Sequence, residues 1–352
     1  MANWYCTREQ LKRFGGVNGA DEDAQVDHII EARSREIDRA TRRFFIPRTE
    51  TRLFRWPPRQ TSRATVLWLD QDLISVTTLQ TKAQDSSPTT IAAADFFLEP
   101  NNLGPPFNRI EIDLSSTAAF ESGDTPQRSI SVLGSWGFSN DTKSAGTVAS
   151  GLASSSSAVS MVSSDSSLIG VGNTLLIESE QIFVSAKAFA ALDSILIDGA
   201  LTKSKSEVSV TVDTGHGIAD GEIIMVDSEQ MLVESSTATV LTVTRAYNGS
   251  VLAAHSNDTA VQIARTLTIE RGINGTTAVT HSNATVIYVY EPPFDIVDLC
   301  IAESLAFHAQ HGAKWGRTVG PGEGGFEFKT RALGDIRNKV IAQYKKLREA
   351  AI

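Results

Sequence analysis

Apolar residues near the N-terminal end of the chain recur every three or four positions, which is the period of an amphipathic helix. One such stretch runs from about Ala24 to Phe45, and Pro47 is expected to end it because proline lacks a backbone donor and clashes with the preceding turn. A shorter helix is predicted over residues 7–14, where Thr7 and Gln10 have the spacing of a capping box. The N-terminal region is therefore predicted to be helical.

The same helical period returns at the C-terminal end. It begins after Pro292-Pro293 and continues to His311-Gly312. A glycine-rich loop follows, and a last helix is predicted from about Asp335 to Ala350, with an apolar stripe surrounded by basic residues. Short helices at both ends of a chain bury their apolar faces only against each other or against a partner. The two ends are therefore expected to come together.

Between these regions the pattern is typical of β-structure. Residues 49–139 contain short β-rich runs separated by prolines, which predicts a small β domain. Residues 140–167 are dominated by Ser, Ala, Gly and Thr, a composition typical of a flexible linker.

Two internal repeats follow this serine-rich segment. Residues 241–263 align without gaps with residues 267–289, and nine of 23 positions are identical. Residues 172–184 align in the same way with residues 221–233. Both repeats alternate apolar and polar positions, and their Asn-Gly elements suit tight turns. We therefore expect one or two duplicated β modules over residues 168–290.

These elements predict an α+β protein in which a small helical module, built from the N- and C-terminal helices, is interrupted by a large β-rich, sandwich-like insertion. The expected divisions are an N-terminal helical part (1–48), the small β domain (49–139), the linker (140–167), the duplicated β insertion (168–290) and the C-terminal helices that complete the helical module (291–352). The insertion is expected to be self-contained, so that removal of about residues 142–289 would leave the remainder folded.

Charge is distributed unevenly along the chain. The net charge is −9, but residues 1–60 carry +3 and residues 295–352 carry +2, which leaves −14 for the middle. Proteins that bind nucleic acid tightly need a concentrated basic face, so tight DNA binding is not predicted. No apolar run is long enough to predict a membrane span, and the N-terminus lacks the pattern of a signal peptide.

The chain contains two cysteines, Cys6 and Cys300, and neither has a His or Cys neighbour at metal-ligand spacing. Neither a disulfide scaffold nor a zinc site is predicted from this pattern. Both residues are expected to act as small buried apolar groups in a reducing compartment.

No catalytic, cofactor-binding or metal-binding constellation is predicted, and the chain is expected not to be an enzyme. The glycine-rich segment at residues 320–325 lacks the Gly-Lys-Ser/Thr ending of a phosphate loop and is predicted to be a flexible loop. His255 and His281 occupy equivalent repeat positions, for which a structural hydrogen-bonding role is expected. Asp70 and Asp72 are predicted to lie in a turn between strands.

Four segments stand in an order that resembles a known family. They are WLDQDLISVTTL, DFFLEPNNLGPPFNRIEID, ISVLGSWGFS and PPFDIVDLCIAESLAFHAQH. Together they resemble the head-to-tail connector (adaptor, or head completion) proteins of tailed bacteriophages, over about residues 4–139 and 291–350. The resemblance implies a structural virion protein of the neck between capsid and tail, assembled in the host cytoplasm.

The resemblance also implies partners. Members of the family form a homo-oligomeric ring, commonly a dodecamer, that docks on the portal protein and presents a platform to the next neck or tail protein, a stopper or tail terminator. DNA passes through the ring with only weak contacts, and no membrane is involved. Residues 140–290 depart from the short form of the family, and this insertion is expected to brace subunits, decorate the neck or bind glycan. The alternative function is a tail-associated or receptor-binding protein whose β modules contact host-surface carbohydrate.

The last helix is predicted to be the portal-docking element. Its narrow apolar stripe suits a groove in a partner, and its basic residues suit an acidic partner surface. The alternative is that this helix packs on the N-terminal helices of its own subunit. The proposed interface residues are Ile336, Arg337, Lys339, Val340, Tyr344, Lys345, Leu347 and Arg348.

Because the chain is acidic overall, we predict that its affinity for DNA is weak and falls steeply as salt concentration rises. Fluorescence anisotropy with labelled duplex DNA at several salt concentrations measures this. Sub-micromolar, sequence-selective binding at physiological salt would contradict the prediction.

Overall fold

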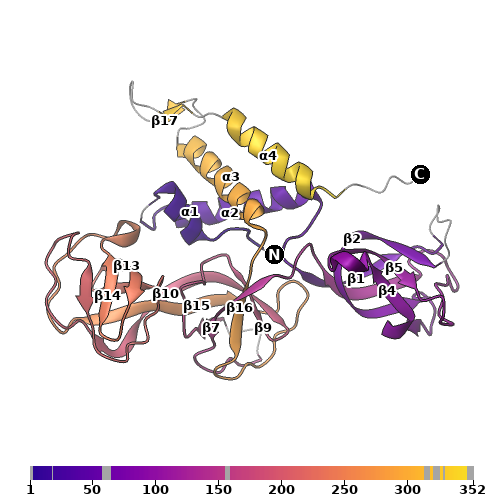
Figure 1. Cartoon of the computed structure of the whole chain (residues 1–352), viewed down its shortest axis with the longest axis horizontal. Helices are drawn as coiled ribbons and strands as arrows, with labels where there is room; N and C mark the ends of the chain where they lie inside the picture. The colour runs from indigo at the N-terminus through magenta and orange to yellow at the C-terminus, as the bar shows by residue number, and fades with distance from the viewer. Residues whose placement is uncertain are drawn as a thin grey trace.

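The computed structural model describes residues 3–17, 19–57, 65–154, 159–312, 318–319, 326–327 and 330–346. Helices lie at the two ends of the chain and antiparallel sheets lie between them, so the prediction of an α+β protein is confirmed. In Figure 1 the helices form one group, the small sheet lies to one side of it, and the large sheet extends below it to the other side. Among the described residues no helix is both long and apolar enough to cross a membrane.

The N-terminal helices are α1 (Arg8–Gly15) and α2 (Asp23–Thr41). The predicted capping box is present, because the Thr7 hydroxyl accepts from the Gln10 N–H and the Gln10 side chain accepts from the Thr7 N–H. Helix α2 ends before the predicted boundary at Pro47. Arg42 adopts a left-handed conformation (φ 57°) and donates its N–H to the carbonyl of Asp38. A local C-cap therefore ends this helix, not the proline.

The C-terminal helices are α3 (Phe294–Gly312) and α4 (Thr330–Tyr344). Helix α3 starts directly after the Pro-Pro pair, as predicted, and α4 starts five residues before the predicted Asp335. Two short strands, β17 (Thr318–Val319) and β18 (Phe326–Glu327), pair between the two helices. The glycine-rich loop at 320–325 and residues 347–352 lie outside the described residues.

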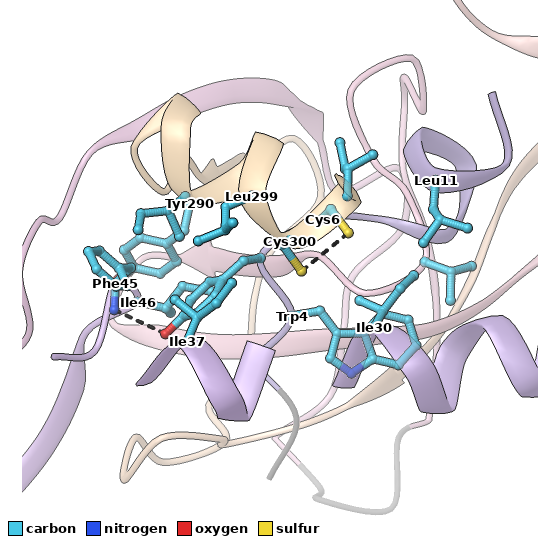
Figure 2. Packing of buried hydrophobic residues seen from close by; sticks show 14 of the residues in the cluster. Trp4, Cys6, Leu11, Ile30, Ile37, Phe45, Ile46, Tyr290, Leu299 and Cys300 are labelled. Carbon is cyan, nitrogen blue, oxygen red and sulfur yellow. Dashed lines mark hydrogen bonds between the residues drawn. The ribbon is translucent and has the colours of Figure 1, made fainter. Parts of the chain in front are cut away.

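Helices from both ends of the chain share one hydrophobic core. Ile30 and Ile37 of α2 are fully buried in it, as are Leu299 and Cys300 of α3. Figure 2 shows these side chains facing one another across the helices. Each fully buried aliphatic side chain contributes about 1.5–3 kcal/mol. The expected union of the two ends is therefore present as one packed unit.

The small sheet consists of β1 (Arg48–Phe54), β2 (Val66–Thr81), β3 (Thr89–Ile91), β4 (Phe96–Glu99), β5 (Phe107–Ile112) and β6 (Ile130–Trp136). Its order is β1-β6-β2-β5-β4, with β3 paired to β2, and all pairs are antiparallel. A Cβ atom at Gly134 would lie 2.2 Å from the Ser75 carbonyl oxygen. Only glycine therefore permits the observed approach of β6 to β2.

The large sheet consists of β7 (Thr142–Thr147), β8 (Ser160–Val162), β9 (Thr174–Ile177), β10 (Glu180–Leu196), β11 (Ser209–Thr211), β12 (Ile223–Val226), β13 (Glu229–Ser236), β14 (Val240–Thr244), β15 (Ala260–Glu270) and β16 (Val286–Tyr290). Its order is β11-β14-β13-β12-β15-β10-β9-β16-β7, with β8 paired to β15. The long strands β10 and β15 pair with each other and connect two lobes, each of which has its own hydrophobic core. Figure 1 shows β13 and β14 at the far end of this sheet from β9 and β16.

The two lobes are the duplicated modules, and one is nested inside the other. We define module A as residues 145–184 together with 267–289, and module B as residues 194–263. Module B is inserted between the two halves of module A. The repeat of 26 positions relates the C-terminal parts of the modules, and the repeat of 49 positions relates their N-terminal parts.

Isolated β-bridges show the same relation. In module A, Leu152 pairs with His281, and in module B, Leu201 pairs with His255. These pairs keep the offsets of 49 and 26 that the sequence repeats show. The longer repeat thus extends back into the serine-rich segment, where residues 152–160 and 201–209 are identical at five of nine positions.

The expected linker at residues 140–167 is wrong as a description of the whole segment. Strands β7 and β8 belong to the large sheet, and Val148, Leu152 and Met161 are buried in the core of module A. An antiparallel sheet can bury one face and expose the other to solvent. The few apolar residues of this segment cover the buried face, and its many small polar residues occupy exposed positions.

Module A is also part of the helical core. Val171, Phe183 and Ile273 belong to the same buried cluster as the helices, and the Phe183 ring meets the Trp4 ring edge to face at 5.4 Å between centroids. Removal of residues 142–289 would therefore expose this core. The expectation that the whole insertion is self-contained conflicts with this packing, whereas module B contributes no residue to that cluster.

We predict that module B alone can be removed. Ala188 and Thr266 are cross-strand partners, so an Asn-Gly turn in place of residues 189–265 closes a two-residue hairpin. The shortened protein is expected to stay monodisperse and to keep its helical circular dichroism, because the core of module A has no member in the deleted range. The companion deletion of 142–289 should aggregate or lose helicity. Loss of helicity in the shorter deletion would contradict the nested arrangement.

Candidate functional site

Each β module contains a buried cluster of one arginine, one glutamate and one histidine. In module A the Arg271 Nε and Nη2 atoms donate to the two carboxylate oxygens of Glu180 at 2.6 and 2.7 Å. His281 Nε2 lies 2.8 Å from Glu180 Oε2, and His281 Nδ1 lies 2.8 Å from Glu178 Oε2. The first three side chains are fully buried, whereas Glu178 reaches the surface. Such two-point arginine–carboxylate pairs are among the strongest polar contacts in proteins.

Module B repeats this cluster at the equivalent positions. Arg245 donates to both oxygens of Glu229 at 2.7 and 2.8 Å. His255 Nε2 lies 2.9 Å from Glu229 Oε2, and its Nδ1 lies 2.7 Å from Asp227 Oδ2. Both ring nitrogens of each histidine thus face carboxylate oxygens. The structure gives these histidines the hydrogen-bonding contacts that the repeat pattern suggested.

In each module the cluster joins segments that are distant in sequence. Glu180 accepts N–H groups from Gly272 and Val279 at 3.0 and 3.1 Å. Arg271 also donates to the carbonyls of Ala153 and Val279 at 2.7 and 2.6 Å. The cluster therefore clamps the two halves of module A together across the inserted module B.

Hydrogen bonds control the ionisation of the clustered glutamates. Burial of Glu229 opposes its ionisation, but donors from Arg245, Ala253 and His255 together outweigh burial and lower its pKa to about 2. The pKa of Glu180 is lowered by the equivalent balance. Both carboxylates are therefore ionised, and each accepts several hydrogen bonds. Within the described residues no group of three or more His, Cys, Asp and Glu side chains is arranged to hold a metal ion.

The repeat of 26 positions contains the arginines and histidines of these clusters, but their acidic partners were not identified from the sequence. Glu178 and Glu180 match Asp227 and Glu229 in the repeat of 49 positions. This repeated acidic-x-Glu pattern is the feature of the sequence that could have identified the acidic partners. That it faces the histidine of the 26-position repeat is shown only by the antiparallel pairing of the strands.

A groove of about 870 Å³ lies where the helical module meets the small sheet. Its walls come from the C-terminal end of α2, the exposed face of the small sheet and the residue two positions after α4. The lining residues are Arg39, Arg42, Arg43, Phe54, Trp68, Leu69, Asp70, Gln71, Asp72, Pro100, Pro106, Asn108 and Lys346. The groove combines basic, aromatic and proline side chains.

Asp72 organises the charges of this groove. It was expected in a turn, but both Asp70 and Asp72 lie within β2, and Asp72 is buried. Its two oxygens contact Arg43 Nη1 at 2.7 Å and Lys346 Nζ at 3.2 Å. Burial lowers the pKa of Lys346, and Asp72 opposes that effect. These contacts attach the end of the C-terminal helix to the small sheet.

Arg39 and Arg42 remain on the open side of the groove. Both are exposed, and neither forms an ion pair with any of the residues that the structure describes. Trp68, which is 44% exposed, lines the same groove. Arginine and tryptophan are enriched at protein interfaces because they combine a large contact area with directed polar groups. This part of the groove is suited to a protein partner.

The exposed aromatic surface continues across the small sheet. Trp68 is the cross-strand partner of Arg109, whose guanidinium carbon lies 5.3 Å from the centre of the indole ring. On the neighbouring strand Phe97, which is 53% exposed, pairs with Glu111. Cross-strand partners lie on one face of a sheet, so Trp68 and Phe97 are on the same face.

The residues of the predicted docking helix have different surroundings. Val340 is buried in the helical core, and the Tyr344 ring meets the Phe45 ring at 5.4 Å between centroids. Arg337 forms ion pairs with Glu36 and Glu303 of its own chain.

The other side of this helix faces solvent. Ile336 is 52% exposed, and Lys339 and Lys345 are exposed. Leu347 and Arg348 lie outside the described residues. The predicted stripe is therefore divided between the core of its own chain and the surface, and only the exposed part is accessible to a partner.

We predict that loss of either clamp arginine leaves a buried, unpaired glutamate and costs about 3–5 kcal/mol in its own module. Arg271→Ala should lower the main thermal transition, because module A packs on the helical core. The matched change Arg245→Ala should unfold module B before the rest of the protein. Calorimetry combined with limited proteolysis measures both. Equal effects of the two substitutions on helicity would contradict the different roles of the modules.

Comparisons with protein-family models, with curated proteins and with solved structures found no match for this chain.

Proposed function

We propose that the protein is a structural virion component of a tailed bacteriophage, a head-to-tail connector that assembles as a ring, docks on the portal protein and links the capsid to the tail. The order of motifs that resembles this family supports the proposal. The observation that carries it is the helical module, because segments from both ends of the chain build one compact unit with exposed interface-type side chains on its rim.

Docking is assigned to the exposed flank of α4. Ile336 and Lys339 lie on this flank, while Val340 and Tyr344 on the adjacent face hold the helix on its own core. A helix fixed in this way presents its flank without the entropy cost of ordering on binding. Lys339 and Lys345 add positive charge that favours an acidic partner surface.

The groove beside Trp68 is assigned to contact with a neighbouring subunit or with the next neck or tail protein. The exposed side chains of Arg39 and Arg42 suit an acidic partner, and the central part of the chain supplies an excess of acidic residues. The same polypeptide therefore carries both basic and acidic regions. This suits a head-to-tail contact between identical subunits, which joins two different surfaces of the chain. DNA is proposed to pass with weak contact because the net charge is negative.

The β modules are proposed to brace or decorate the neck. The buried arginine, glutamate and histidine of each module are used by internal contacts. We therefore do not propose these side chains as a carbohydrate-binding site. A tail-associated, glycan-binding protein remains the alternative that the following test distinguishes.

We predict that Ile336→Asp combined with Lys339→Glu weakens binding to the portal protein of the same virus by roughly ten-fold or more, because it reverses charge and removes apolar area at an interface centre. The melting temperature should stay unchanged, since both side chains are exposed. Asn338→Asp, on the opposite exposed side of α4, is the matched control and should bind normally. Tyr344→Ala should instead cost about 2–5 kcal/mol of stability.

Pull-down, calorimetry and electron microscopy of the mixture provide the measurements. Normal portal binding by the double variant would contradict the docking assignment. Absence of any ring or portal complex, together with specific binding to host glycans, would contradict the connector proposal and favour the alternative.

A further inference from the structure

We propose that Cys6 and Cys300 form a reversible, intramolecular disulfide site that fastens the N-terminal segment of the chain to helix α3. The sulfur atoms lie 3.6 Å apart although 294 positions separate the two residues. Figure 2 shows the two thiols facing each other inside the helical core. The inference is independent of the proposed function, because it rests only on the position of these side chains.

The geometry requires little movement. The sulfur–sulfur bond of a disulfide is about 2.05 Å long, so the two sulfur atoms must move closer together. Small rotations of the two side chains and a slight shift of the backbone are sufficient for this. Both thiols are free, and they are in direct contact as a hydrogen-bonded pair. Intramolecular oxidation is therefore favoured over pairing between molecules, because the second thiol is already in place.

The surroundings distinguish the two sulfurs. The hydrogen bond from Cys6 lowers the pKa of the Cys300 thiol, although burial opposes this effect, and Ser34 Oγ lies 3.5 Å from the Cys300 sulfur. The same contact and burial raise the pKa of Cys6. The thiolate is the reactive form, and whichever of the two sulfurs reacts first, the other lies in contact with it.

Burial selects the oxidant. Cys6 is 3% exposed and Cys300 is 0% exposed, so a small neutral molecule such as hydrogen peroxide reaches them more readily than a bulky disulfide. The thiolate of one cysteine attacks one peroxide oxygen, the O–O bond breaks, and the released hydroxide takes a proton to become water. The sulfur of the other cysteine then attacks the resulting sulfenic acid, the S–O bond breaks, and a second water leaves. Two thiols and one peroxide thus give one disulfide and two waters.

The bond would secure a segment on which several parts of the molecule depend. Residues near Cys6 contact two elements and one loop. The Tyr5 N–H donates to Ser34 Oγ of α2 at 3.1 Å, and the Trp4 ring packs on Phe183 of β10. The Arg8 N–H donates to the carbonyl of Val171, in the loop before β9, at 3.0 Å. Release of this segment would open the helical core and separate it from module A. A disulfide at Cys300 prevents that release and closes a loop that includes both the small and the large antiparallel sheet, from β1 to β16.

The experiment exposes the full-length, native protein to a small excess of hydrogen peroxide. Intact mass spectrometry should show the loss of two hydrogens, and thiol titration in denaturant should fall from two groups to none. Digestion should give one peptide pair that joins Cys6 to Cys300. The melting temperature should rise by about 5 °C, because a very long loop is closed in the unfolded state, and dithiothreitol should reverse all of these changes.

Cys6→Ala and Cys300→Ala are the controls for the thermal shift, and neither should respond to peroxide with a higher melting temperature. Oxidation of the unfolded wild-type protein controls for proximity and should give the intramolecular bond far more slowly. The central readout is on the wild-type chain, so poor folding of a variant leaves the test intact. Two thiols that stay titratable, oxygen addition without a disulfide, or disulfide-linked dimers would each overturn the proposal.

Discussion

The packing of the N-terminal segment against both the C-terminal helices and module A is the constraint on which the rest of the structure depends. Trp4, Tyr5 and Cys6 are buried between elements that lie hundreds of residues apart in sequence. Short helices such as α1 are marginal alone, so they persist only when this common core forms. The core therefore requires the two ends of the chain and both halves of module A to be present together.

A second constraint acts inside the β modules. Module A is interrupted by module B. Its two halves are distant in sequence, so strong interactions are needed to hold them together. The Arg271 and Glu180 pair, with the histidine beside it, supplies such an interaction. Breaking one partner of a buried pair is costly, and the same set of side chains is present in both lobes of the sheet.

The connector proposal and the disulfide proposal use different parts of one architecture. The exposed flank of α4 and the groove beside Trp68 are surface features. The contact between Cys6 and Cys300 is internal. A rigid helical core benefits both, because an interface is pre-organised only when the helix that carries it is held in place. The stability of the core and the presentation of the surface are therefore linked.

The sequence alone determined the local features of this protein. The helical and alternating periods predicted the α+β class, and the capping box at Thr7 was correct, because these features depend on neighbouring residues. The sequence repeats also indicated duplication. Tertiary structure decided the nesting of the modules and the role of the serine-rich segment, which depend on strand pairing over long distances.

Tertiary structure likewise decided which side chains form sites. Nothing in local sequence brings Cys6 next to Cys300, places Asp72 against Lys346, or turns Val340 inward while Ile336 stays exposed. Each of these contacts joins elements from opposite parts of the chain. Periodicity identifies the apolar face of a helix, but the elements packed around that helix determine how much of the face is covered.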